Sequence, residues 1–280
     1  GSSRALFANP ATMGRTPNKF DASFTNASYI ADITYSFGSA LYRPANGQYG
    51  VIGVSVVAVD YGSIVRTIRA DNEQGYVDLG QYSPTSLAVG LGYARSVTDR
   101  FTVGGQAKYV RQDMDDQILS VDENGSPSTE GFAKSVVAYD FGVVYDTGFR
   151  SLRFAMSTRN FAPEFSYVEQ NVELPLTFRV GFEMNLMDLT RFDSEMHALL
   201  FSVEGRRPRD MAEQVRFGGE YTLFNTISAR AGYAVPADGR PPALSLSVSF
   251  WSRNQIAPAS WKVRFRYSML LVAIVSGSGE

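Results

Sequence analysis

Apolar and polar residues alternate with a period of two along most of the chain. The pattern is strictest at residues 244–250, where every second residue is a serine, and it recurs at residues 176–186 and 215–223. Successive side chains of a β-strand point to opposite faces, so each segment has one apolar and one polar surface. About a dozen such segments, each of roughly ten residues, predict a transmembrane antiparallel up-and-down β-barrel.

The alternation begins at Phe20 and follows an N-terminal segment, residues 1–19, that does not alternate. Within that segment, residues 5–11 are expected to form a short helix and a turn. The domains are therefore expected to be residues 1–19, a candidate plug, and residues 20–280, the barrel. Thirteen strands are expected at residues 20–28, 30–43, 49–66, 84–97, 101–113, 133–147, 151–161, 174–187, 196–206, 213–224, 226–235, 242–252 and 259–269. The apolar run 270–275 is expected to begin a fourteenth strand, because bacterial barrels have an even strand count.

Short and long connections between the expected strands tend to alternate. Tight turns are expected at residues 98–99, 148–150 and 225, and the longer connections are residues 69–83, 114–132 and 162–173. Bacterial outer-membrane barrels have short periplasmic turns and longer extracellular loops, so the sequence predicts that the three longer connections are extracellular.

Charged residues gather on the face opposite the apolar one. A basic residue at the middle of the bilayer costs about 2–4 kcal/mol, so the apolar face is expected to contact lipid and the charged face to line the lumen. Both signs of charge occur there, which favours a network of ion pairs that hydrates and braces the wall over a dedicated ligand path. The lumen-facing candidates are Lys108, Asp140, Arg179, Glu183, Glu204, Arg216, Glu220 and Arg230, with Arg264 and Arg266 near the C-terminus.

The composition excludes several other classes of protein. Apolar residues make up 44% of the chain and mean hydropathy is −0.12, and no run of about 18 apolar residues predicts a transmembrane helix. The net charge of −2 argues against a nucleic-acid partner. The absence of cysteine excludes thiol chemistry and disulfides. The chain does not start with a signal peptide, which an exported barrel requires, so a mature or trimmed chain is expected.

Residues that would carry catalysis are sparse, and we expect no enzyme, no cofactor and no metal site. His197 is the single histidine. A barrel phospholipase needs a serine nucleophile near its histidine, but the residue two positions after His197 is Leu199. The Gly-x-Ser-x-Gly, His-Glu-x-x-His and phosphate-loop motifs are absent. The acidic residues between 113 and 125 do not fit a calcium-binding loop and are expected to be hydrated.

Several short segments, in order along the chain, resemble the PorV/PorQ family of outer-membrane proteins. The sequence Asn9-Pro10-Ala11, after Leu6-Phe7, resembles the N-terminal signature of that family. Similar segments follow at residues 29–35, 59–62, 138–145, 159–161 and 230–233. The resemblance implies a barrel of 14 strands with the architecture of the FadL fatty-acid transporters, in the bacterial outer membrane.

In the PorV branch, the resemblance implies a non-enzymatic role in type IX secretion. The barrel would bind the C-terminal signal domain of secreted cargo at the translocon and deliver it to the surface attachment machinery, contacting cargo through residues 69–83, 114–132 and 162–173. The alternatives are a FadL-like channel for hydrophobic small molecules, with residues 1–19 as its plug, and a structural barrel in a larger surface assembly. Membrane lipid is a partner in each case.

Overall fold

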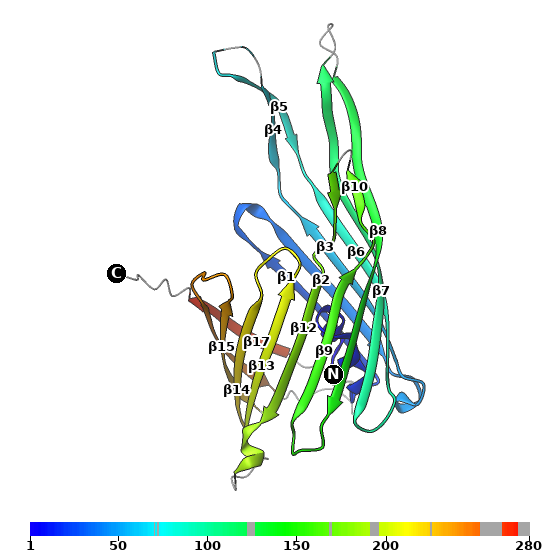
Figure 1. The fold of residues 1–280 in the computed structure, drawn as a ribbon, viewed down its shortest axis with the longest axis vertical. Coiled ribbons are helices and arrows are strands. Elements are labelled where there is room, and N and C mark those ends of the chain that lie inside the picture. Colours follow the sequence, from blue (N-terminus) through cyan, green and yellow to red (C-terminus); the bar gives the residue numbers. More distant parts are fainter. Residues whose placement is uncertain are drawn as a thin grey trace, which may run out of the picture. The chain divides into compact units, whose positions relative to one another are not determined.

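The computed structural model describes residues 1–69, 71, 73–121, 127–167, 170–190, 196–224, 226–252 and 265–273. The chain forms two compact units. Unit 1 comprises Gly1–Ser96, Thr102–Gly142 and Arg159–Leu174, and unit 2 comprises Val97–Phe101, Val143–Thr158 and Pro175–Glu280. Each unit consists mainly of antiparallel β-sheet (Figure 1).

Unit 1 contains the first strands and two β-hairpins outside the main sheet. Its main-sheet strands are β1 (Phe20–Ser28), β2 (Thr34–Tyr42), β3 (Val51–Asp60), β6 (Thr85–Ser96), β7 (Phe101–Val121) and most of β8 (Pro127–Asp146). The hairpins are β4–β5 (Ile64–Arg69, Tyr76–Tyr82) and β10–β11 (Phe165–Tyr167, Gln170–Val172). The 3₁₀ helices are η1 (Ser3–Phe7), η2 (Pro10–Arg15), η3 (Ile30–Asp32) and η4 (Pro44–Gly47).

Unit 2 contains the remaining strands, and β9 (Arg153–Phe161) is divided between the units. Its other strands are β12 (Thr177–Asn185), β13 (His197–Pro208), β14 (Gln214–Leu223), β15 (Ile227–Pro236), β16 (Ala243–Ser252) and β17 (Phe265–Ala273), with η5 at Leu186–Leu189. The hydrogen-bonded order is β1-β2-β3-β6-β7-β8-β9-β12-β13-β14-β15-β16-β17, thirteen strands in the described part of the chain. Neighbours in the sheet follow one another in sequence, which confirms the predicted up-and-down order.

The three longer connections differ from the prediction of loops. Residues 69–83 contain the whole of β5, and residues 162–173 contain the β10–β11 hairpin. Within residues 114–132, β7 continues as far as Val121 and β8 begins at Pro127. Figure 1 shows the β4–β5 hairpin and the far ends of β7 and β8 at the same end of unit 1. Most side chains of β5 are exposed on both faces, so the alternation of burial that marks the main-sheet strands is absent there.

Other strand boundaries were also predicted wrongly: residues 30–32, expected in a strand at 30–43, form η3. A single strand was expected at 49–66, but β3 ends at Asp60, whose carboxylate accepts a hydrogen bond from the Gly62 amide at 2.9 Å. Gly62 has φ +73°, which reverses the chain and starts a separate hairpin. At the C-terminus, β17 is one strand where two were expected at 259–269 and 270–275; residues 259–264, 274 and 275 lie outside the described part.

The predicted alternation of faces is clear in the central strands of unit 1. Along β6, Leu91 and Tyr93 are 62% and 47% exposed, whereas Ala94, the residue after Tyr93, is fully buried. On the buried side, Leu41, Val51 and Ala94 form a hydrophobic core with residues of the N-terminal segment. We call this side of unit 1 the inner face and the opposite side the outer face. None of the helices in the described residues combines the length and the apolar character that crossing a membrane requires.

Candidate functional site

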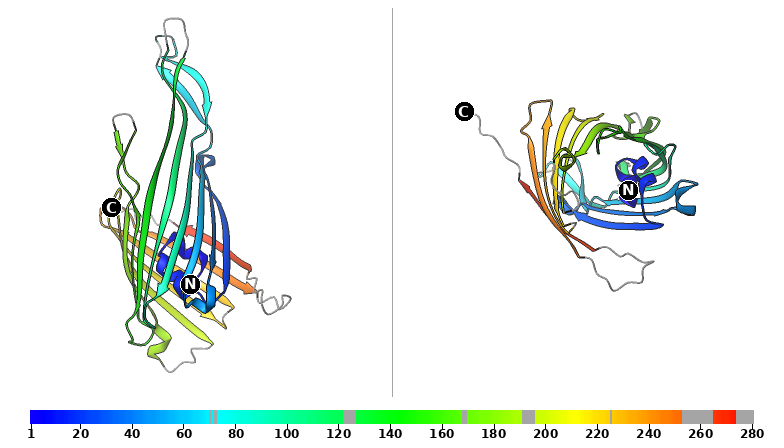
Figure 2. Two further views of the ribbon diagram at one scale, coloured as in Figure 1. Left: turned by 90° about the vertical axis from the view of Figure 1, so that its right-hand side faces the viewer. Right: turned by 90° about the horizontal axis from the view of Figure 1, so that it is seen from below.

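The N-terminal segment packs on the inner face of unit 1. Helices η1 and η2 contact each other, and both contact β3, while η2 also packs extensively on β6. Figure 2 shows this segment, in dark blue, on the concave side of the blue to green strands. Leu6 and Met13 are its buried apolar anchors, 1% and 0% exposed. The segment thus fills space on the inner face instead of extending into solvent.

Glycines on neighbouring strands make room for this packing. A Cβ atom at Gly53 of β3 would lie 2.9 Å from Leu6 Cδ1, and one at Gly92 of β6 would lie 2.5 Å from Leu6 Cδ2. At Gly104 of β7 it would lie 2.7 Å from both the amide nitrogen and the Cα of Ala11. We call these residues, together with Gly142 of β8 beside Asn9, the glycine band. A larger side chain anywhere along the band would meet the N-terminal segment.

Polar contacts fix the segment at both of its ends. The Ser3 amide donates to the Asp21 carboxylate at 2.7 Å, and its hydroxyl lies 3.1 Å from that of Ser23. At the other end, Arg15 Nε donates to Thr102 Oγ1 at 3.0 Å. Asn9 caps η2, because its side-chain oxygen accepts from the Ala11 amide at 3.0 Å. The segment is therefore held in one register on the strands.

A charged cluster is buried on the inner face beside the glycine band. Lys108 Nζ lies 2.7 Å from the Asp140 carboxylate, and the two side chains are 9% and 0% exposed. Asn160 links them, since its amide donates to Asp140 Oδ1 at 2.7 Å and its side-chain oxygen accepts from Lys108 at 2.5 Å. Arg159 Nε lies 3.7 Å from the other oxygen of Asp140. These contacts surround Lys108 Nζ and one oxygen of Asp140, and either charge alone in this buried place would be costly.

The other six candidates all lie on one face of the unit 2 sheet, which we call its polar face. Cross-strand register places Glu204 opposite Arg216 and Glu220 opposite Arg230. Arg230 Nε lies 2.5 Å from Glu220 Oε2, with side chains 22% and 32% exposed. The remaining two candidates are Arg179, opposite Arg206 in the register, and Glu183, opposite Ser202.

Several partners of these candidates were not found from the sequence. Glu183 pairs with Arg153 at 2.6 Å, and Arg153 also reaches Asp146 at 2.9 Å. Asn160 has φ +60°, a backbone conformation that no alternation pattern predicts. The sequence showed the residues of the glycine band only as glycines within strands. Their role in making room for the N-terminal segment depends on which residues of that segment lie above them. The structure therefore adds partners rather than replacing the predicted positions.

His197 lies at the start of β13, beside two aromatic rings. Its Nδ1 is 2.7 Å from the Tyr221 hydroxyl, and its ring centroid is 6.3 Å from that of Phe224. These contacts belong to an exposed aromatic cluster. In the described part of the chain, no group of three or more histidine, cysteine, aspartate and glutamate side chains has the geometry to hold a metal ion.

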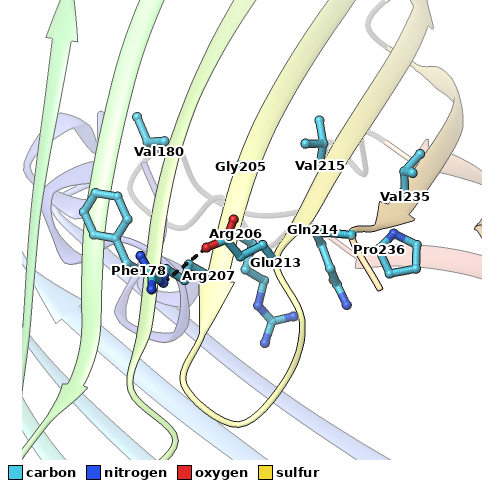
Figure 3. Close-up of a pocket in the computed structure, with 11 residues that line it drawn as sticks. Phe178, Val180, Gly205, Arg206, Arg207, Glu213, Gln214, Val215, Val235 and Pro236 are labelled. Carbon is cyan, nitrogen blue, oxygen red and sulfur yellow. Dashed lines mark ion pairs between the residues drawn. The ribbon is translucent and has the colours of Figure 1, made fainter. Parts of the chain in front are cut away.

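Unit 2 carries an apolar hollow of about 340 Å³ on the face opposite the charged candidates (Figure 3). Val180, Gly205 and Val215 are neighbours in the cross-strand register and form its centre. Arg207 at the rim forms an ion pair with Glu213 at 3.3 Å, drawn as a dashed line in Figure 3. The basic group at this rim is therefore neutralised by its neighbour.

Comparison with known proteins concerns the fold. No family model and no curated protein matches the sequence. Among solved structures, the toluene transporter TbuX of Ralstonia pickettii matches with a TM-score of 0.53 at 15% identity, over 89% of this chain and 85% of that chain. The toluene transporter TodX of Pseudomonas putida matches with a TM-score of 0.51 at 12% identity, over 88% and 84%.

These likenesses confirm the predicted all-β, antiparallel barrel of FadL-like architecture. At 15% and 12% identity they concern the fold alone, since one barrel fold serves many functions. The finer assignment to the PorV/PorQ family receives no support from them and stays a prediction.

Proposed function

We propose that this chain is a non-enzymatic outer-membrane barrel through which hydrophobic small molecules pass. The observation that carries the proposal is the likeness to two solved structures described as toluene transporters, over more than four fifths of each chain. The short-turn end of the barrel would face the periplasm and the hairpin end the exterior. The N-terminal segment would then close the lumen from within.

The inner face of unit 1 is consistent with a closed and apolar passage. Leu6 and Met13 bury apolar surface against the glycine band, so the segment docks by contacts that a hydrophobic molecule can also make. The charges nearby are not free to bind a polar solute, because Lys108 and Asp140 are paired with each other. An apolar solute would therefore compete with the N-terminal segment for the same surface.

Uptake by whole cells tests this proposal. Cells that express the full chain should take up radiolabelled toluene faster than cells with an empty vector, while uptake of a hydrophilic disaccharide should be the same in both. Surface exposure of a tag in the β4–β5 hairpin would show that the protein is inserted. Equal toluene uptake by the two strains, with insertion demonstrated, would refute the proposal.

A second candidate function is the delivery of secreted proteins in type IX secretion. It is supported by the resemblance to the PorV/PorQ family at residues 9–11, 29–35 and 138–145. The ordered β4–β5 and β10–β11 hairpins offer a surface for cargo that simple loops would not. A pull-down in mild detergent distinguishes the two. Recovery of secreted proteins that share a C-terminal domain favours delivery, and a lone barrel favours small-molecule passage.

A further inference from the structure

The outer face of unit 1 contains an apolar hollow of about 450 Å³. Its floor consists of small residues of β7, and its walls are large residues of the neighbouring strands. The floor residues are Gly105 and Ala107, and the wall residues are Leu91, Tyr93, Tyr139 and Phe141. The size is in the range of sites that bind small apolar ligands.

The register of the strands explains the shape of the hollow. Gly105 lies opposite Tyr93, and Ala107 lies opposite Leu91, so two small residues follow one another between large ones. The walls project outward, since Leu91 is 62% and Phe141 is 53% exposed. Tyr93 is held in place by the hydrogen bond that its hydroxyl donates to the Tyr49 carbonyl at 3.0 Å. The result is a trough along β7, one wall of which is held by this hydrogen bond.

A basic residue stands at one end of this trough. Arg95 lies two residues beyond Tyr93 on the same face of β6, which places its Cα about 7 Å further along the strand. It is exposed, and in the described part of the chain it forms no ion pair or side-chain hydrogen bond. It also lies at the short-turn end, one residue before the end of β6. An apolar trough that ends at a free arginine matches a molecule with an apolar chain and an anionic head.

We propose that this trough binds one acyl chain of an anionic phospholipid, with the lipid phosphate against Arg95. The short-turn end is the periplasmic end under the proposed function, so the lipid would come from the inner leaflet. The inference rests on the proposed function only for membrane insertion and orientation, and not on which molecule passes through the lumen. Basic residues at the membrane surface recognise anionic lipid head groups in the same way.

The hollow of unit 2 provides an internal comparison. It is also apolar, and both Arg206 and Arg207 line it (Figure 3). Arg207 is paired with Glu213 at 3.3 Å, whereas Arg206 lies opposite Arg179 in the register and so belongs to the polar face of the sheet. A neutralised rim offers an anionic head group little attraction. We therefore expect selective retention of anionic lipid at the trough beside Arg95 and not at the unit 2 hollow.

Native mass spectrometry of the full chain, refolded in detergent, tests the proposal. The probe is dioleoylphosphatidylglycerol, and dioleoylglycerol, which has the same chains but no phosphate, is the comparison. Only the folded band in a heat-mobility gel is analysed, so a variant that fails to fold is not counted. Wild type should retain one phosphatidylglycerol. Arg95→Gln should lower its retention about fivefold, and Arg95→Lys should restore most of it.

Three further variants complete the test. Gly105→Leu fills the trough and should abolish retention, whereas Gly219→Leu, at a glycine with open space around its Cβ position, should not change it. Arg207→Gln should also leave retention unchanged. The proposal is overturned if wild type retains no phosphatidylglycerol, or if Gly105→Leu or Arg95→Gln retains as much of it as wild type does. It is also overturned if a second copy of this chain occupies the trough, which would be seen as a lipid-free dimer. Toluene uptake by Gly105→Leu is expected to be normal, so this test and the uptake test fail independently.

Discussion

Gly104 and Gly105 are adjacent in β7 and face opposite sides, so they form a matched pair for testing the docking of the N-terminal segment. A Cβ at Gly104 would lie 2.7 Å from backbone atoms of Ala11. This clash can be removed only if η2 or β7 shifts. A Cβ at Gly105 would lie 3.4 Å from the Asp140 carbonyl oxygen, which is an ordinary contact distance. We therefore expect Gly104→Ala to loosen the segment and Gly105→Ala to leave it docked.

The expected size of the effect follows from the contacts. Overpacking of a well-packed site costs about 1–3 kcal/mol, and 1.4 kcal/mol changes an equilibrium tenfold. Burial of Leu6 and Met13 stabilises the docked state by about 1.5–3 kcal/mol for each side chain. The segment should thus stay docked most of the time in Gly104→Ala, while the undocked population rises roughly tenfold.

A single cysteine reports this population, because the chain has none of its own. Ser3 is fully buried and close to cysteine in size, so Ser3→Cys should react with a water-soluble thiol reagent only when the segment undocks. In folded protein, labelling should be about tenfold faster in Ser3→Cys/Gly104→Ala than in Ser3→Cys/Gly105→Ala. Equal labelling rates in the two proteins would refute the argument from the glycine band.

Four further substitutions test the faces and the charge pairs. Phe217→Arg, on the apolar face of β14, should reduce insertion into liposomes, because a basic residue costs about 2–4 kcal/mol at the middle of the bilayer. Arg216→Ala, on the opposite face, should insert as wild type does. Equal insertion of the two variants would contradict the assigned register. Asp140→Ala should lower the free energy of unfolding in urea by about 3–5 kcal/mol, since it leaves Lys108 buried without its partner. Glu220→Ala should lower it by about 1 kcal/mol or less, because its pair with Arg230 is partly exposed, and a loss as large as that of Asp140→Ala would argue against burial as the cause.

The strands that have one apolar and one polar face were predictable from the sequence, and the hairpins outside the main sheet were not. In β14, Val215 and Phe217 are exposed on one face while Arg216 lies on the other, as the period of two predicts. Along β5, within residues 69–83, most side chains on both faces are exposed, so burial does not select apolar residues at alternate positions. Hydrated hairpins are held by backbone hydrogen bonds, which leave little trace in the order of side chains. The sequence therefore indicated loops where the structure has strands.

The candidate charges show a similar division. Alternation alone placed Lys108 and Asp140 among the charged positions, because strand geometry fixes the face of every residue. It gave no pairing, since partners lie on neighbouring strands whose register depends on the connections between them. Asn160, which links the two side chains, comes from β9 through a backbone turn that the sequence pattern does not encode. Faces are thus a local property of the sequence, whereas contacts are a property of the assembled sheet.

Strand β7 shows how one strand serves two surfaces. Its even-numbered residues include Gly104, which lies under the N-terminal segment, and Lys108, which belongs to the buried ion pair. Its odd-numbered residues include Gly105 and Ala107, which form the floor of the trough. Because the two sets point to opposite faces, a substitution in one set leaves the other surface intact. The two functions proposed for these surfaces, closure on the inner face and lipid binding on the outer face, can therefore be separated by substitutions one residue apart. A change at Gly104 that altered lipid retention, or one at Gly105 that undocked the N-terminal segment, would show that the two surfaces are coupled through the backbone of β7.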